Sequence, residues 1–399
     1  MDALMLPLNW QRVRLGDICE IGNGGAYETL IVENGNFKLI SLNSIDINGN
    51  LKNTMKRVNF YDNSLKQDDI VMVLSDVAHG DFLGLCAVIP SNDYVLNQRM
   101  GRLRKRNDCI NILFLRLYIN ANQKYFKMQG QGSSQLNLSK KAIEDFEILL
   151  PPLNEQIAIA NILSGLDRYL YSLDALILKK ESVKKALSFE LLSQRKRLKG
   201  FNQNWQRVRL GDVAEIKRGA SPRPIENPKW FCTNSNVGWV RISDISKNSR
   251  FLYKTAQKLS KKGIEKSRFI KQNSLIMSMC ATIGKPIITK IDTCIHDGFV
   301  VFENPKIDLN YLYYFLCYIE KEWLESGQQG SQVNLNVDLI KNKEVFCPKN
   351  LNEQIAIANI LSDVDHEIIS LKNKKRQFDN IKKALNHDLM SAKIRVLKK

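Results

Sequence analysis

Two segments of the chain carry apolar residues in alternating steps of four and three. This rhythm places one apolar stripe along a helix and, sustained over about four heptads, is typical of a coiled coil. Each segment can form a helix of about 44 residues, or about 65 Å, and two such helices in one chain can pair antiparallel. The residues that we expect to pair the helices and to support partner docking are Ile159, Leu163, Leu166, Leu170, Leu173 and Ile177, and Ile357, Leu361, Val364, Ile368, Leu371 and Phe378.

Lysines interrupt both stripes, at Lys180 and Lys184 in the first and at Lys375 and Lys382 in the second. A buried lysine in such a seam costs stability, so these residues either fix the register or mark where the helices splay. We interpret the basic run at residues 195–197 as a solvated helix end, with a contact as the alternative.

The rest of the chain forms two blocks with short apolar runs of strand length and longer amphipathic runs of helix length, a pattern that predicts α/β domains. Pro151, Pro152 and Pro348 close the blocks before the long helices. The expected strands are Phe37–Leu42, Val71–Leu74, Leu85–Ile89, Trp239–Ile242 and Leu275–Met279, and Phe146–Leu150 follows the helix that Ser139 caps. The expected helices are Ile112–Phe126, one capped by Ser139, and Tyr311–Glu325.

The chain also repeats itself. Trp10–Asp17 recurs letter for letter as Trp205–Asp212, and Leu153–Ser164 recurs as Leu351–Ser362. Identity in these segments beside divergence between them indicates a common scaffold that carries two different readouts, related by a pseudo-twofold axis. The predicted fold class is therefore α/β, with two α/β domains separated by two long antiparallel coiled-coil helices, and with parts at 1–152, 153–200, 201–350 and 351–399.

Composition narrows the class of protein. The eight cysteines contain no C-x-x-C pair and only four histidines are present, so we expect reduced thiols, a cytoplasmic protein and no metal site. No apolar run approaches the length of a membrane span. The net charge of +18 favours an anionic partner, and nucleic acid is the first candidate. The first block contributes almost none of this charge and the second block contributes half of it.

Catalytic motifs are missing from the sequence. We find no [DN]-P-P-[YFW] loop of adenine methyltransferases, and Ile283–Pro286 lacks the first glycine and the Ser/Thr of a P-loop. The glycine-rich Ile21–Gly25 has no apolar strand before it, so we expect a plain turn there. The chain is predicted to be non-catalytic by itself and to need no cofactor.

Basic runs and polar loops are the candidate DNA contacts. Lysine and arginine neutralise phosphates, while glutamine and serine can bond to base edges. The alternatives are a solvated face for the basic runs and a structural turn for the two loops at Gln129–Gln135 and Gln328–Gln332. The basic candidates are Arg99, Arg102, Arg104, Lys105, Arg106, Arg218, Arg223, Lys258, Lys261 and Lys262. The loop candidates are Gln131, Ser133, Ser134, Gln135, Gln329, Ser331 and Gln332.

Taken together, the two W-x-x-V-x-L-G-D openings, the Q-G-S-x-Q-like loops and the two L-N-E-Q-I-A-I-A-N-I-L-S segments resemble the specificity (S) subunit of type I restriction-modification systems over nearly the whole chain. The resemblance implies two target recognition domains, at 1–152 and 201–350, that each read half of a split site in double-stranded DNA. It also implies that the helices set the spacing between the half-sites and dock two methyltransferase (M) subunits, with restriction (R) subunits completing the complex. The near-neutral first block departs from this picture.

Three alternatives remain open from the sequence. The chain could be a stand-alone methyltransferase or nuclease, a coiled-coil scaffold that binds no DNA, or the specificity subunit of a related modification system that is not type I.

Overall fold

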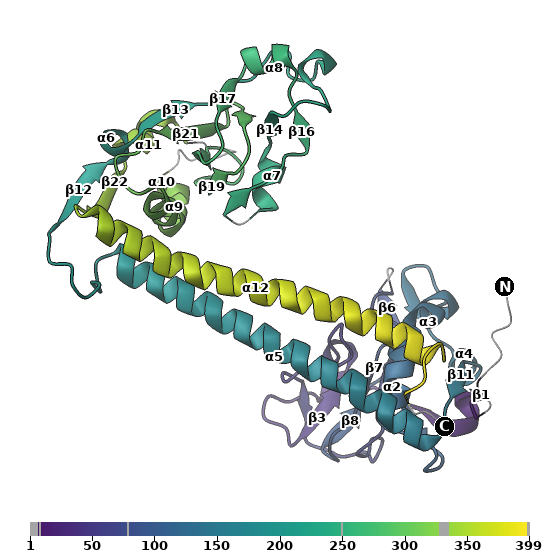
Figure 1. Cartoon of the computed structure of the whole chain (residues 1–399). Helices are drawn as coiled ribbons and strands as arrows, with labels where there is room; N and C mark the ends of the chain where they lie inside the picture. The colour runs from purple at the N-terminus through teal and green to yellow at the C-terminus, as the bar shows by residue number, and fades with distance from the viewer. Residues whose placement is uncertain (1–6, 8, 78–79, 249, 327–334, 397–399) are drawn as a thin grey trace. The chain divides into compact units, whose positions relative to one another are not determined.

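The computed structural model describes residues 7, 9–77, 80–248, 250–326 and 335–396, without the side chains of 324–326. The chain folds into two compact units, which are described one at a time. Unit 1 combines Met1–Asp174 with Asn373–Lys399, and unit 2 is Ala175–Lys372. Each unit contains one globular domain, called domain 1 and domain 2 below, together with half of each long helix (Figure 1).

Domain 1 is built on two sheets that enclose a core of Ile40, Val71 and Leu96. The larger sheet is antiparallel and has the order β2 (Cys19–Asn23), β9 (Met100–Lys105), β5 (Ile70–Val73) and β7 (Cys86–Val88). The smaller sheet has the order β4 (Arg57–Val58), β3 (Phe37–Ile40) and β8 (Tyr94–Leu96). Two strand pairs join β1 (Gln11–Arg14) to β11 (Glu147–Leu150) and β6 (Ser75–Val77) to β10 (Gln135–Asn137). The helices are α1 (Leu15–Ile18), α2 (Ile112–Ala121), α3 (Gln123–Gln129) and α4 (Lys140–Glu144), with short 3-10 turns η1 (Glu28–Leu30) and η2 (Leu42–Ser44).

Domain 2 repeats the two sheets of this plan with one additional strand in each. Its larger sheet has the order β13 (Glu215–Arg218), β21 (Phe299–Glu303), β18 (Leu275–Ser278), β19 (Pro286–Thr289) and β15 (Phe251–Leu252). Its smaller sheet has the order β16 (Gln257–Lys258), β14 (Gly238–Val240), β20 (Thr293–Ile295) and β17 (Arg268–Ile270). The strand β12 (Trp205–Arg209) pairs with β22 (Glu344–Pro348). The helices are α6 (Leu210–Val213), α7 (Ile242–Ser246), α8 (Lys261–Glu265), α9 (Leu309–Tyr318), α10 (Glu320–Ser326) and α11 (Val337–Asn342), with η3 at Pro228–Trp230.

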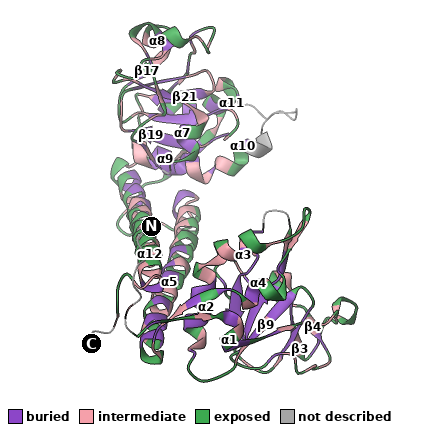
Figure 2. Ribbon diagram, turned by 90° about the vertical axis from the view of Figure 1, so that its right-hand side faces the viewer, coloured by how far each residue is buried: buried purple, intermediate pink, exposed green. Residues whose placement is uncertain are grey.

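The long helices α5 (Leu153–Leu192) and α12 (Leu351–Met390) have 40 residues each and run antiparallel. Every position of both apolar stripes is buried or half-buried, and Figure 2 shows buried patches along helices whose other faces are exposed. Each helix ends shortly before a residue with positive φ, Gln194 after α5 and Ala392 after α12. These left-handed residues stop both helices in the same way.

The seam lysines reach carboxylates on the facing helix. In unit 2 Lys184 pairs with Asp365 at 2.6 Å and Lys180 pairs with Glu367. In unit 1 Lys375 pairs with Asp174 at 2.7 Å and Lys382 pairs with Asp167. Each pair joins a fixed position on α5 to one on α12, so the lysines fix the register, which is one of the two interpretations left open by the sequence.

The repeated segments meet at a buried cluster that closes each unit. In unit 1 the indole of Trp10 donates to Glu155 at 3.2 Å, and Arg395 binds the same carboxylate through two bonds of 2.7 Å. In unit 2 Trp205 donates to Glu353 at 3.1 Å and Arg197 donates to it at 3.0 Å. Both glutamates are almost fully buried, so each needs its cation. The interpretation of 195–197 as only a solvated helix end is therefore wrong for Arg197.

The predicted fold class is confirmed, and the local predictions differ from the structure at a few places. The helix expected at 112–126 is two helices, because the Asn122 side chain donates to the carbonyl of Tyr118 and ends α2. The helix expected at 311–325 likewise divides into α9 and α10 at Ile319. The turn expected at 21–25 is wrong in its first half, because Ile21 lies in β2. The four-part division of the chain stays a prediction, since the compact units cut through the long helices.

Candidate nucleic-acid interface

The polar loop of domain 1 lies beside the turn that carries Arg99. The backbone N–H of Leu74 donates to the carbonyl of Arg99 at 3.0 Å, and the N–H of Leu138 donates to the carbonyl of Leu74 at 2.8 Å. The Ser75 hydroxyl then donates to the Asn137 side chain at 2.6 Å, across the β6–β10 pair. These bonds bring two segments that are far apart in the sequence to one edge of the domain, called the loop edge below.

The candidate side chains at this loop edge are open to solvent. Arg99 occupies a turn with φ of 68° and is exposed. Gln131, Ser133 and Ser134 are exposed, and Gln135, at the start of β10, is half-buried. Exposed polar groups held on a paired backbone are able to approach a base edge without losing bonds within the protein.

The rest of the basic run at 99–106 does not join this edge. Arg102 donates to Glu20 and to the carbonyl of Ser64, and Arg104 holds the buried Asp69 through bonds of 2.8 and 2.6 Å. Strand β9 then carries the chain about 20 Å away, at about 3.3 Å per residue. There Lys105 pairs with Asp108 at 2.8 Å, and Arg106 donates to the carbonyls of Gly16 and Cys19. The run is therefore not one basic patch, and DNA contact by these four residues stays a prediction.

Domain 2 builds the same edge from different side chains. The N–H of Met279 donates to the carbonyl of Gly298 at 2.8 Å, and the N–H of Leu335 donates to the carbonyl of Met279 at 3.0 Å. Next to them Arg218 donates to the carbonyl of Asp297 at 2.7 Å and Arg223 donates to its carboxylate at 2.8 Å. Gln329, Ser331 and Gln332, the loop candidates of this domain, lie outside the described residues.

A second basic surface adjoins the loop edge of domain 2. Arg268 on β17 donates to the carbonyl of Arg218 at 2.5 Å, which connects the smaller sheet to that edge. Lys258 on β16 and Lys261 and Lys262 on α8 are exposed, and none of the three makes an ion pair with another described residue. A cavity of about 590 Å³ lies beside Lys258, lined by Phe231, Cys232, Thr233, Thr255, Ala256, Gln257 and Lys258. We call the smaller sheet with η3 and α8 the basic lobe.

The basic lobe has no counterpart of equal charge in domain 1. Between β13 and β18 the chain carries twelve basic and three acidic residues, whereas the equivalent span between β2 and β5 carries five and six. Two of the five basic residues between β2 and β5 form ion pairs, Lys38 with Asp93 at 3.0 Å and Lys56 with Glu28 at 3.3 Å. The charge difference seen along the sequence is therefore also a difference between two equivalent surfaces.

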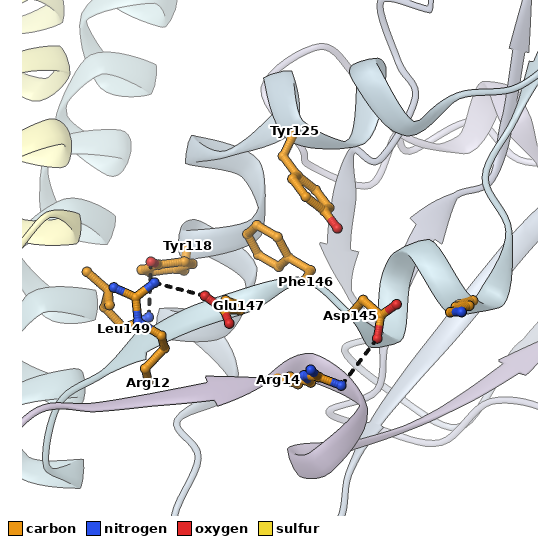
Figure 3. A pocket seen from close by; sticks show the side chains of 9 residues that line it. Arg12, Arg14, Tyr118, Tyr125, Asp145, Phe146, Glu147 and Leu149 are labelled. Carbon is orange, nitrogen blue, oxygen red and sulfur yellow. Dashed lines mark hydrogen bonds and ion pairs between the residues drawn. The ribbon is translucent and has the colours of Figure 1, made fainter. Parts of the chain in front are cut away.

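Each unit also has a hollow between its terminal strand pair and its domain helices. In unit 1 it measures about 840 Å³ and is lined by Tyr118, Tyr125 and Phe146, with Arg12 paired to Glu147 at 2.8 Å (Figure 3). Unit 2 has an equivalent hollow of about 530 Å³ beside Phe346, where Arg207 pairs with Glu344 at 3.5 Å. Because both arginines are paired across the strands, we assign these hollows to the repeated scaffold and not to the candidate DNA surface.

The fold defines a two-domain protein in which an α/β domain is duplicated on a shared antiparallel helix pair. Residues 7–180 and 202–378 each match the family described as "Type I restriction modification DNA specificity domain". The chain belongs to this family, as the resemblance in its sequence indicated.

Two curated relatives come from Methanocaldococcus jannaschii. The type I restriction enzyme MjaVIII specificity subunit is 26% identical, over 99% of this chain and 95% of the relative. The putative type I restriction enzyme MjaX specificity subunit is 24% identical, over 98% and 95%. Among solved structures, the S subunit of the type I restriction-modification system from M. genitalium has a TM-score of 0.65 at 15% identity, covering 98% of both chains. The M. genitalium structure supports the fold.

Within the described residues of this chain, no helix is both long and apolar enough to span a bilayer.

Sequence reasoning missed the residues that hold the scaffold together. Arg197 stands 42 residues after Glu155, and Arg395 stands 42 residues after Glu353. Each arginine binds the glutamate of the other repeat, Arg197 binding Glu353 and Arg395 binding Glu155. Equal positions of the two arginines in the two repeats were a signal that could have identified them. The backbone bonds that form the loop edges left no such signal.

Proposed function

We propose that the chain is the DNA-binding specificity subunit of a type I restriction-modification complex. Each domain reads one half of a bipartite site in double-stranded DNA, and the helix pair sets the spacing between the halves. The observation that carries this proposal is that the same loop edge is assembled twice, by equivalent backbone bonds, from side chains that differ between the domains. Two unlike readers on one scaffold suit an asymmetric split site.

The proposed base contacts lie at the loop edges. In domain 1 they are Arg99 and the loop residues Gln131, Ser133, Ser134 and Gln135. In domain 2 they are Arg218 and Arg223. Gln329, Ser331 and Gln332, which lie outside the described residues, are proposed as base contacts from the sequence alone. The lysines of the basic lobe, Lys258, Lys261 and Lys262, are the proposed phosphate contacts. Their exposed ammonium groups make no ion pair with another described residue, and such groups attract the DNA backbone without reading its sequence.

The helix pair is the proposed docking platform for two M subunits. Large apolar side chains stay exposed on its outer faces, including Tyr171 at 77%, Leu178 at 65% and Ile381 at 45% exposure. Such residues on a helix that already buries its seam suit a protein partner. One of the similar solved structures concerns complex assembly of the type I R-M system. We propose that R subunits join the same assembly and that this chain supplies no catalytic group itself.

The test is a selection from random duplexes with the chain purified together with its M subunits. We expect one enriched motif made of two short half-sites separated by a fixed number of unread base pairs. Replacing Arg99 should relax one half-site, and replacing Arg223 should relax the other. Methyl transfer by the isolated chain would instead favour a stand-alone enzyme, and failure of the complex to retain any duplex would favour a scaffold without DNA binding.

A further inference from the structure

A buried arginine attaches domain 2 to the helix pair. Arg250, just before β15, is only 6% exposed. Its guanidinium donates to the Ser362 hydroxyl on α12 at 2.6 Å, and on α9 to the Asn310 side chain at 2.7 Å and to the Tyr314 hydroxyl at 3.0 Å. Because burying a guanidinium is costly unless its donors are bonded, these contacts of Nη1 and Nη2 hold three elements in one arrangement, whereas Nε has no partner among the described residues.

Tyr314 links Arg250 to the contact surface between the two long helices. Its hydroxyl accepts from Arg250 and donates to the Asp365 carboxylate at 2.8 Å, and Asp365 also pairs with Lys184 of α5 at 2.6 Å. The arginine is thus joined, through one tyrosine, to the ion pair that fixes the helix register. Burial, and then the charge of Asp365, raise the pKa of Tyr314, so its hydroxyl keeps its proton and remains a donor.

The helix side of this network is repeated in unit 1, but the hydrogen bonds from the domain side are not. The buried Arg116 of α2 interacts with the charge of Asp167, yet its hydrogen bonds among the described residues go to the segment 48–50 of its own domain. Ser164, Asp167 and Lys382 stand at the positions of Ser362, Asp365 and Lys184, and Asp167 pairs with Lys382 in the same way. Helices α2 and α9 occupy equivalent places in the two repeats. The N–H of the N-cap residue Asn111 donates to Gln156 in unit 1, and the N–H of the N-cap residue Asp308 donates to the equivalent Gln354 in unit 2. On this alignment Leu117 stands at the position of Tyr314, and a leucine offers no polar group to the helix pair.

We propose that Arg250 and Tyr314 are positioning residues, which fix the orientation of domain 2 on the helix pair and so restrict the spacing of DNA half-sites that the protein accepts. This inference rests on the proposed function. Apolar packing tolerates small rotations of a domain, whereas hydrogen bonds lose strength steeply as their angles change. Without the network domain 2 still packs on the helices, but its reading surface is free to turn through a wider range.

The experiment compares Arg250→Met and Tyr314→Phe with wild type, each as the full chain with its M subunits. The matched control is Tyr311→Phe, on the same helix. Tyr311 is also a buried tyrosine, but its hydroxyl donates to the carbonyl of Phe346 within unit 2 at 3.2 Å and not to the long helices. Bound duplexes are selected from a random pool and sequenced, which reports the half-sites and the spacer length separately.

We expect wild type and Tyr311→Phe to enrich one spacer length. Tyr314→Phe and Arg250→Met should keep both half-sites but lower the preference over spacers one base pair shorter or longer by about tenfold, which corresponds to about 1.4 kcal/mol. A single sharp spacer for Tyr314→Phe, or a changed half-site with an unchanged spacer, overturns the inference. Should Arg250→Met fail to fold, Tyr314→Phe decides alone. If wild type enriches no split site, the proposed function itself is wrong and the inference falls with it.

Discussion

The basic lobe of domain 2 should control how binding depends on salt. The perturbation is the double substitution Lys261→Gln and Lys262→Gln on α8, which removes two exposed ammonium groups that lack ion pairs among the described residues. Glutamine is one atom shorter than lysine, carries no charge and has a similar helix propensity. The hydroxyl of Ser260, which caps α8 by accepting from the N–H of Gly263 at 3.2 Å, is untouched, so we expect the fold to persist.

The magnitude follows from counterion release. Each phosphate contact contributes about 0.9 to the slope of log affinity against log salt concentration. Adjacent residues on a helix point about 100° apart, so either one or both of these lysines reach phosphates at once. The slope should therefore fall by about 0.9 to 1.8 in the variant. Over a fourfold rise in salt, wild type should lose about 3.5- to 12-fold more affinity than the variant.

The assay is fluorescence anisotropy of labelled duplexes with the S–M complex at several salt concentrations. The matched control is Lys38→Gln with Lys56→Gln in domain 1, which removes the same charge from cations already paired with Asp93 and Glu28. We expect the control to change the slope by less than the α8 variant does, and both to act alike on cognate and unrelated DNA. Equal slopes in the two variants, or a loss confined to the cognate site, would refute the assignment of these lysines to phosphates.

Three further predictions concern stability and spacing. Arg197→Met leaves the buried carboxylate of Glu353 without its cation and should lower the free energy of unfolding by about 3 kcal/mol in urea titrations; an unchanged midpoint would contradict the closing role of this pair. Four-residue insertions after Lys179 and at the facing point after Ser370 lengthen both helices by about 6 Å, so the selected spacer should grow by one or two base pairs, and an unchanged spacer would exclude a ruler. Burial lowers the pKa of His296, so the folded state disfavours its proton and stability should fall as the pH drops below about 6.5; His296→Asn should flatten this dependence in urea titrations at several pH values.

The long helices and their pairing could be predicted from the sequence because their signal is local and periodic. Apolar residues at Leu163, Leu170 and Ile177 mark one face of a helix wherever the rest of the chain lies. The seam lysines were harder, since their partners stand on the other helix. Only the antiparallel register places Lys382 opposite Asp167, where the lysine that interrupts the apolar stripe forms an ion pair.

The candidate site was less predictable because exposure depends on contacts between distant residues. Arg102 and Arg104 look like Arg99 in sequence, yet Glu20 and Asp69, 82 and 35 residues away, engage their guanidinium groups. The alternation of side chains along β9 could have shown which residues lie on opposite faces of the strand, but it could not have identified Glu20 and Asp69 as partners. Local charge density therefore overestimated the basic surface of domain 1, while the lysines of domain 2, with few acids nearby, stayed exposed.

Residues that are the same in both repeats and residues that differ between them have different structural roles in the two units. Residues that close or align the scaffold, such as Glu155 and Glu353, occur in both repeats and have the same kind of partner in each. Residues that differ include Tyr314, which bonds to Asp365 of that scaffold from the domain side, and Leu117, which stands at its position in domain 1. The helix pair thus offers both domains the same polar groups, and each domain determines how firmly it is held. In the proposed function, this shared scaffold carries two readers that differ in their grip on DNA, through the basic lobe, and in their orientational freedom, through Arg250.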